Sequence, residues 1–311
     1  MDGGFVLFAR LVMLTLVPYV LAAQGTMLGG RTGVFNVAQE GIMLVGASVG
    51  FLVAYAWGSI GYGLALAALT GALFGLVLAS FTTTLRLNQF VVGLALFFIG
   101  VALSTLLYKL TIGVTLTPPR IPTLPEIHLP GLGDIPVLGP ILFRQNVLVY
   151  AAVVLSLLFW YGLYRTRLGQ NLRAVGENPM AADSLGVNVA LMRYATTILG
   201  AALMGLAGAY LPMVFTGTFT EGMVRGRGWL AIVLTFFGGW RPDWILAGSL
   251  FFAAVEVLSF RVQVTGVGIA YQFVLMLPYV ATIFVMVFAF QRVRAPAALG
   301  QNYDRESRTM A

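Results

Sequence analysis

Polar side chains interrupt the apolar sequence at a few points, and these are the positions where contact with a ligand is expected. The first is the stretch GVFNVAQEG, which contains Asn36, Gln39 and Glu40. A carboxylate at membrane depth is costly, so such a residue is a functional candidate. The alternative is structural: Glu40 caps the helix that begins near Gly41, and the two amides satisfy bent backbone.

A second polar stretch, FTEGMVRGRG, contains Glu221 and Arg227. A carboxylate and an arginine this close along the chain indicate either a pair at the mouth of a transport pathway or an ion pair that anchors the break. Glu256, within AAVEVLSF, is the most isolated charge in an apolar run. It either meets Arg261 one turn further on or faces a helix bundle.

Asn88 and Gln89 open another apolar run. Neutral amides donate and accept hydrogen bonds without the desolvation cost of a charge. They are therefore candidates for contact with a sugar or a nucleobase. The alternative is that they cap a helix at the membrane interface.

Composition places these residues in a membrane protein. Of the 311 residues, 59% are hydrophobic and only 9% are charged. A transmembrane helix needs about 20 apolar residues, whereas barrel strands alternate over segments of about ten. The apolar runs are long and do not alternate, so we predict an all-α polytopic membrane protein with about eight to ten transmembrane helices, some of them re-entrant or broken. The chain contains no cysteine, which excludes disulfides and thiolate metal sites.

The predicted spans are 5–23, 42–57, 62–85, 90–108, 147–164, 194–214, 244–260 and 267–290, with a shorter piece at 229–239. We assign the basic stretches 165–193 and 291–311 to the cytoplasm, which places the N-terminus and the proline-rich loop 109–145 outside. Residues 1–290 then form a single transmembrane domain. An apolar helix followed by a polar break occurs at 5–41 and again at 194–228, in opposite directions, and this pattern predicts an inverted repeat.

The stretch from Arg165 to Arg193 is the longest polar segment between two strongly apolar ones, and its residue types predict a short helix. Asn178 is a good N-cap, Pro179 fits the first helical position, and Gly186 suits a left-handed stop. A helix this short is not stable alone in water, so it needs a partner to dock on. The side chains expected to form its apolar face are Met180, Ala181, Ala182 and Leu185. The alternative is an ordinary charged loop between two membrane helices.

The sequence GENPMAADSLGVNVALMRY resembles the cytoplasmic coupling loop of ABC importer permeases, in the group that includes the branched-chain amino acid and ribose permeases. It is most similar to the nucleoside and simple-sugar permeases that work with lipoprotein receptors of the basic membrane protein type. The matching positions in this loop are Arg173, Gly176, Glu177, Asn178, Pro179, Ala181, Ala182, Gly186 and Tyr194. The polar breaks resemble the same family through Gly33, Asn36, Glu40, Gly41, Asn88, Gln89, Phe219, Thr220, Glu221, Gly222, Gly226, Arg227 and Gly228.

This resemblance implies a type II-like ABC permease fold in the bacterial plasma membrane, with nucleosides or simple sugars passing by alternating access. It also implies ATPase subunits that bind ATP and Mg, a second homologous permease, so that the pair is a heterodimer, and an external substrate-binding lipoprotein. The ATPase-coupling residues would be Glu177, Asn178, Pro179, Ala181, Ala182, Asp183 and Gly186. The substrate-pathway candidates are Asn36, Gln39, Glu40, Asn88, Gln89, Glu221 and Arg227.

An enzymatic function is not predicted. The only lysine, Lys109, lies in YKL rather than in a phosphate-binding loop, so this chain is not expected to bind ATP or another cofactor itself. The single histidine, His128, lies in the proline-rich loop and indicates neither a metal site nor a triad. The alternative function is a stand-alone secondary transporter or channel for a small polar solute, which would have no use for a docked cytoplasmic helix.

Overall fold

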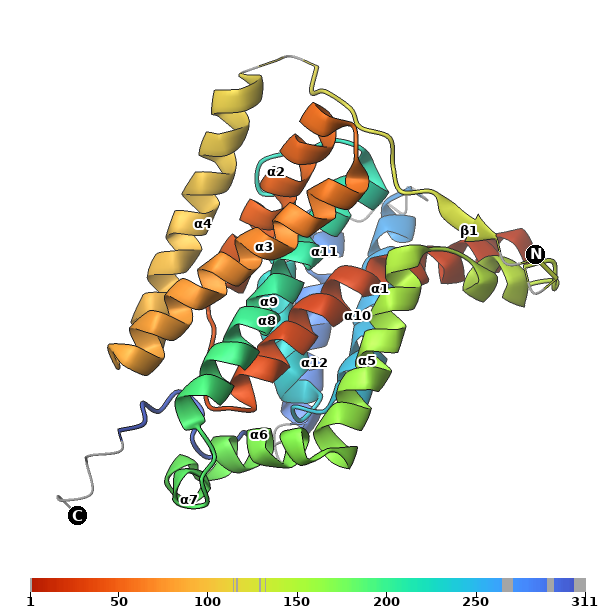
Figure 1. Cartoon of the computed structure of the whole chain (residues 1–311). Helices are drawn as coiled ribbons and strands as arrows, with labels where there is room; N and C mark the ends of the chain where they lie inside the picture. Colours follow the sequence, from red (N-terminus) through yellow and green to blue (C-terminus); the bar gives the residue numbers. More distant parts are fainter. Residues whose placement is uncertain are drawn as a thin grey trace.

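The computed structural model describes residues 2–113, 115, 117–128, 130–131, 133–264, 271–289 and 294–304, and most of these residues are helical (Figure 1). The long helices are α1 (Asp2–Gly30), α2 (Gln39–Trp57), α3 (Ile60–Ala79), α4 (Gln89–Ile112), α5 (Val147–Arg165), α8 (Val189–Tyr210) and α10 (Pro242–Val264). The shorter elements are α6 (Arg167–Glu177), α7 (Pro179–Ser184), α9 (Arg227–Phe237), α11 (Tyr271–Leu275) and α12 (Leu277–Ala289), three π-helical turns η1 (Ser80–Thr84), η2 (Gly139–Phe143) and η3 (Leu211–Thr216), and the strands β1 (Glu126–His128) and β2 (Arg144–Asn146).

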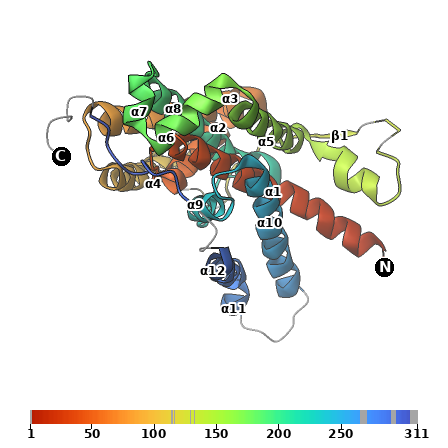
Figure 2. The same cartoon turned by 90° about the horizontal axis from the view of Figure 1, so that it is seen from below.

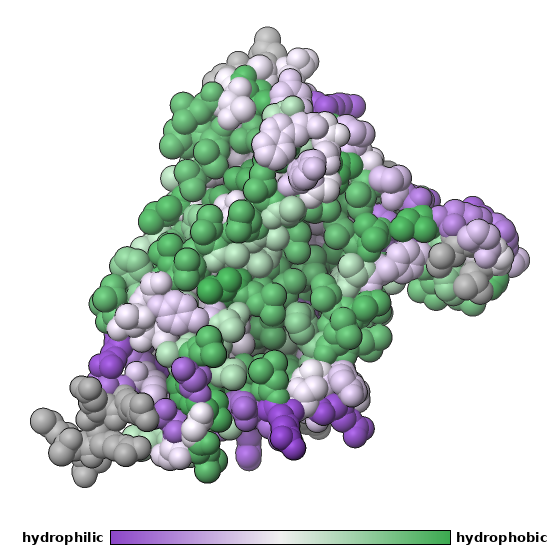
Figure 3. All heavy atoms as spheres, viewed as in Figure 1, coloured by the Kyte–Doolittle hydropathy of each residue, from purple (hydrophilic) through white to green (hydrophobic). Residues whose placement is uncertain are grey.

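Within the described residues, seven helices are long and apolar enough to cross a membrane: α1, α2, α3 with η1, α4, α5, α8 with η3, and α10. Two shorter apolar pieces, α9 and Gln272–Val285 in α11 and α12, correspond to the remaining predictions, although residues 267–270 and 290 of the last predicted span lie outside the described residues. The prediction of an all-α polytopic membrane protein is confirmed. Apolar side chains cover the face formed by α3, α4 and α5, and polar ones gather at the end formed by α6 and α7 (Figure 3).

Asparagine caps begin several of these helices. The side-chain oxygen of Asn88 accepts from the backbone N–H groups of Phe90 and Val91 at the start of α4. Asn146 and Asn188 cap α5 and α8 in the same way. The free N–H groups of a first turn need such acceptors, so these boundaries are set by local sequence.

α8 forms the centre of the bundle and packs against α1, α2 and α3. Glycines allow these helices to come close together. A Cβ built on Gly25 of α1 would lie 2.3 Å from the carbonyl oxygen of Gly200 in α8, and a Cβ on Gly200 would lie 2.3 Å from the carbonyl oxygen of Gly25. Small residues at such crossings let backbones approach and replace the hydrophobic drive that lipid does not supply.

The two helices that precede the polar breaks run in opposite directions. α1 descends toward the end of the molecule that carries α6 and α7, whereas α8 ascends from that end (Figure 1). Each is followed by a polar break, at 31–38 and at 217–226, and then by another helix. These directions are the ones that the predicted inverted repeat requires.

The proline-rich loop lies at the opposite end from α6 and α7, near the start of α1 (Figure 1). It begins later than predicted, because α4 continues through Ile112. β1 and β2 pair antiparallel within it, and the turn η2 lies directly before β2. Glu126 of β1 forms an ion pair with Arg10 of α1, which fixes the loop to the first helix.

We predict that Gly25→Ala destabilises the protein by about 1–3 kcal/mol, because the added methyl group has no room at the α1–α8 crossing. The measurement is the thermal unfolding midpoint of the purified protein. Gly162→Ala is the matched control: its Cβ would meet no atom within 4 Å, and alanine favours a helix over glycine by about 1 kcal/mol. Equal midpoints for the two variants would contradict the close crossing.

We further predict that the proline-rich loop and α7 face opposite sides of the membrane. Because the chain has no cysteine, single cysteines report position directly. Thr123→Cys, on an exposed residue of the loop, should react with an impermeant maleimide in intact cells. Leu185→Cys, at a residue 84% exposed after α7, should react only after permeabilisation. The reverse pattern would invert the topology.

Candidate functional site

The two polar breaks meet inside the bundle, where the first turn of α2 touches the first turn of α9. A Cβ built on Gly228 would lie 2.6 Å from the backbone nitrogen of Glu40, so only glycine fits at this contact. The residue before α9, Gly226, adopts a left-handed conformation with φ of 79° and offers no side chain as a cap. The start of α9 therefore depends on an acceptor from elsewhere in the chain.

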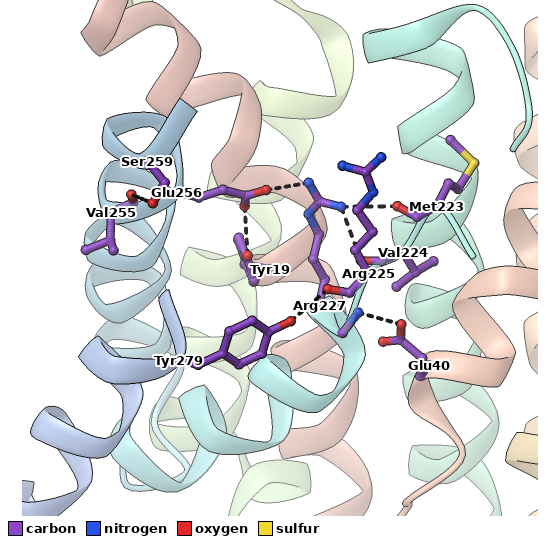
Figure 4. A network of polar contacts seen from close by, with 11 residues as sticks. Tyr19, Glu40, Met223, Val224, Arg225, Arg227, Val255, Glu256, Ser259 and Tyr279 are labelled. Atoms are coloured by element: carbon purple, nitrogen blue, oxygen red, sulfur yellow. Dashed lines mark hydrogen bonds and ion pairs between the residues drawn. The ribbon is translucent and has the colours of Figure 1, made fainter. Parts of the chain in front are cut away.

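Glu40 supplies that acceptor. One carboxylate oxygen accepts from the N–H of Gly226 at 2.7 Å (Figure 4), and the other accepts from the N–H of Gly228 at 2.8 Å. The residue is 8% exposed. A charge at membrane depth costs about 3 kcal/mol on insertion scales, and each hydrogen bond to a charged group contributes about 1.5–3 kcal/mol. Two such bonds at a helix N-terminus are enough to hold the carboxylate in place.

The structural interpretation of Glu40 is thus corrected in its target. Its carboxylate does not cap α2, in whose first turn it lies. It caps α9 through the N-cap residue Gly226 and the helical residue Gly228, which are 186 and 188 positions further along the chain. The neighbouring amides do satisfy the bent backbone as expected. Asn36 accepts from the N–H of Ala38 at 2.8 Å, and Gln39 donates to the carbonyl oxygen of Asn36 at 3.1 Å.

A buried ion pair lies beside this contact. Arg227, the first residue of α9, pairs with Glu256 of α10 at 2.5 Å, and their side chains are 13% and 10% exposed. The hydroxyl of Tyr19 in α1 donates to the second oxygen of Glu256 at 2.8 Å (Figure 4). The pair therefore ties three helices together.

Glu256 faces the helix bundle, which was one of its two predicted positions, and binds Arg227 rather than Arg261. The partner predicted for Glu221 was wrong. Glu221 does not pair with an arginine but with Lys109 at 3.0 Å, in an exposed position at the end of α4. Glu221 therefore lies away from the Arg227–Glu256 pair, although it precedes Arg227 by only six residues in the sequence.

Two arginines hold the start of the first break, at the end away from Glu40. The sequence analysis did not identify them as site residues. Arg193 is 1% exposed and donates from Nε to the carbonyl oxygen of Thr32 at 3.0 Å. Arg31 donates from Nε to the carbonyl oxygen of Trp240 at 2.8 Å. Nothing local in the sequence distinguishes an arginine that enters the bundle from one that faces water.

Asn88 and Gln89 do not join the contact of the two breaks. Asn88 is the N-cap of α4, as the alternative interpretation proposed. Gln89 accepts from the N–H of Phe35 at 2.7 Å and lies near the carbonyl oxygen of Gln301, at 3.4 Å. Gln89 therefore connects the first break to the C-terminal segment, whereas Asn88 serves α4.

The predicted coupling helix is present as α7. Asn178 accepts from the N–H of Ala181 at 2.9 Å, Pro179 is the first helical residue, and Gly186 is left-handed with φ of 84°. Glu177 ends α6 and is exposed.

The exposed face of α7 is narrower than expected. Met180, Ala181 and Leu185 are exposed, but Ala182 is 2% exposed and packs with Val175 and Val189. The expectation that Ala182 belongs to the docking face is therefore wrong, because this methyl group points back into the loop.

Residues 294–304 bind α7 to the first break. The N–H of Ala298 donates to the carbonyl oxygen of Gly176 at 2.9 Å, and the N–H of Gly300 donates to that of Gly33 at 3.0 Å. The hydroxyl of Tyr303 donates to Asp183 of α7 at 3.0 Å. The sequence predicted only a basic tail from 291 to 311, and the other residues of that tail lie outside the described ones.

The profile of a protein family described as "Branched-chain amino acid transport system / permease component" matches residues 9–289. The chain belongs to this permease family. The nucleoside ABC transporter permease NupC of Lactococcus lactis is 36% identical to it over 92% of this chain and 93% of the relative. The guanosine ABC transporter permease NupQ of Bacillus subtilis is 33% identical over 94% of both chains.

The putative glucose ABC transporter permease TsgC13 of Haloferax volcanii is 32% identical over 92% of this chain and 94% of the relative. The Bacillus and Haloferax organisms each have a second, more distant relative, named guanosine permease NupP and glucose permease TsgB13. No solved structure matches the permease.

The permease is a multi-pass protein of the bacterial plasma membrane and the membrane subunit of an ABC importer. Its described residues contain no group of three or more histidine, aspartate or glutamate side chains placed to hold a metal ion. The structure places Asn36, Gln39, Glu40 and Arg227 together where the breaks meet, and it places Asn88, Gln89 and Glu221 elsewhere.

We predict that Glu40→Gln destabilises the permease by about 1–3 kcal/mol, because one acceptor oxygen is replaced by an NH₂ group that faces an N–H donor. The measurement is the thermal midpoint of the purified permease. Glu221→Gln is the matched control, since its exposed ion pair with Lys109 is worth at most about 1 kcal/mol. A loss in the control as large as that in Glu40→Gln would contradict the capping role.

Proposed function

We propose that this permease imports nucleosides. The observation that carries the proposal is its similarity, over nearly the whole chain, to the permeases named for nucleosides in Lactococcus and for guanosine in Bacillus. Glucose is the second candidate, because the Haloferax relative named for glucose is almost as similar. Both kinds of molecule are uncharged and carry several hydroxyl groups.

The partners follow from the same family. Separate ATPase subunits would bind ATP and Mg and dock on the exposed residues Met180, Ala181 and Leu185 of α7 and its C-cap. A six-residue helix offers only a small contact, which suits a mechanical connection rather than a main assembly interface. An external lipoprotein receptor would meet the proline-rich loop.

A second, homologous permease completes the proposed importer. The two guanosine permeases of Bacillus and the two glucose permeases of Haloferax support a heterodimer. The described part of α12 packs on α9 and α10. Ile283 and Phe284 of α12 and Phe273 of the adjoining α11 are exposed. This apolar edge faces either lipid or the second permease.

A short series of hydrogen bonds connects the region of α7 to the contact of the two breaks. Gly176, just before α7, is bonded to Ala298, and two residues later Gly300 is bonded to Gly33 at the start of the first break. The same break leads within seven residues to Glu40, whose carboxylate holds the start of α9. We propose that docking and release of the ATPase shift this connected set and thereby open and close the pathway at the α2–α9 contact.

The test is uptake of radiolabelled guanosine into proteoliposomes that contain the complete importer. Wild-type uptake should require ATP and exceed uptake of labelled glucose. Leu185→Glu should abolish ATP-dependent uptake, because a charge placed in a small apolar contact is strongly unfavourable. At 84% exposure, Leu185 supports no packing in the permease itself, so folding should be unaffected.

Gln170→Glu is the matched control, because it adds the same charge to an exposed residue of the neighbouring α6. It should retain uptake, and both variants should still assemble with the second permease. Full uptake by Leu185→Glu would remove α7 as the docking element. Guanosine uptake without ATP would favour a stand-alone transporter instead.

A further inference from the structure

A cavity of about 350 Å³ lies between α1, α9, α10 and α12, next to the Arg227–Glu256 ion pair. Tyr19, Arg227, Glu256 and Tyr279 project toward one another there from these four helices (Figure 4). Seen from the end that carries α6 and α7, α12 stands apart from most of the bundle and faces α9 and α10 (Figure 2). The volume is near the lower limit of small-molecule sites.

The polar groups of the cavity wall have capacity for a ligand. Each oxygen of Glu256 accepts one hydrogen bond, from Arg227 or from Tyr19, and a carboxylate oxygen can accept two. Gln263 also lines the cavity, and its amide nitrogen has no partner among the residues that the structure describes. A ligand hydroxyl in the cavity would accept from this nitrogen if the side-chain amide turned toward it. An available acceptor beside an available donor suits hydroxyl groups, which both donate and accept.

The remaining wall is apolar and partly aromatic. Leu230, Phe260, Pro278 and Tyr279 form it, and the residues Phe260 and Tyr279 are 42% and 47% exposed. Exposed rings offer flat faces on which a base can stack. Arg227 and Glu256 cancel each other's charge, and Arg225 and Glu40 add one charge of each sign nearby, so the charges around the cavity balance and an uncharged ligand is favoured.

A purely structural role does not explain the whole arrangement. The ion pair needs Arg227, Glu256 and Tyr19, but it does not need a cavity beside it or an amide without a partner. Buried polar groups in native proteins are normally satisfied, and an orphaned one calls for an explanation. A bound polar molecule is one that also accounts for the aromatic wall.

We propose that this cavity binds the nucleoside within a single permease chain, with the base against Tyr279 and Phe260 and the ribose hydroxyls on Glu256 and Gln263. The proposal rests on the proposed function, since it names the place where that substrate is held. It locates binding on the α1–α9–α10–α12 side, away from Asn88 and Gln89.

The experiment measures binding of tritiated guanosine to the complete permease–ATPase complex in nanodiscs, without the external receptor. Wild type should bind saturably. Tyr279→Ala should weaken binding about tenfold or more, because base–aromatic stacking is worth about 1–3 kcal/mol. Gln263→Ala should weaken it about threefold to tenfold, as expected for one lost hydrogen bond.

Two variants control for structure. Leu258→Ala changes an exposed residue of α10 that does not line the cavity, so it should bind like wild type. Val280→Ala changes an exposed neighbour of Tyr279 that does not line the cavity and should also bind like wild type. All four variants should co-purify with the ATPase.

Guanosine binding by Tyr279→Ala equal to that of wild type would overturn the site. So would a complex that imports guanosine with ATP but binds none without its receptor, and that outcome would leave the proposed function intact. Binding of labelled glucose but not guanosine would overturn the nucleoside assignment together with the proposed substrate. Loss of binding in Leu258→Ala or Val280→Ala as large as in Tyr279→Ala would show a general effect on the fold and would overturn the stacking role.

Discussion

The structure depends on one constraint: backbone groups freed by a helix break inside a membrane have no water to bind. The carboxylate of Glu40 meets this constraint for the start of α9 by accepting from Gly226 and Gly228. The same two bonds make the charge of Glu40 tolerable, so the break and the charge stabilise each other. Removing either would leave the other without a partner.

The glycine crossings keep the two breaks in register. Gly25 and Gly200 bring α1 and α8 together, and Gly208 brings α8 against the backbone of Met43 in α2. α1 and α8, the helices that precede the breaks, are held by backbone contacts rather than by long side chains. The segments that follow the breaks are therefore held in fixed positions relative to each other. The contact of α2 with α9 is therefore a consequence of how α8 packs.

Sequence reasoning predicted what local signals determine. Run length gave the membrane spans, and Asn178 and Gly186 gave both ends of α7, because caps act on the nearest turn. It failed where partners are distant. The bonds of Glu40 to α9 and of Glu256 to Arg227 join residues that only the packed bundle brings together. The burial of Ala182 depends on Val175 and Val189, and a helix of six residues has too few positions to reveal which face is covered.

The bond from Glu40 to α9 also orders events during synthesis. A chain is made from its N-terminus, so α1 and α2 enter the membrane long before residues 226 and 228 exist. Until then the carboxylate lacks the amides that satisfy it, and α1 lacks the glycine crossing with α8. The first half of the permease therefore cannot reach its final packing before the second half is inserted. Until then, water or the insertion machinery must supply hydrogen bonds to Glu40.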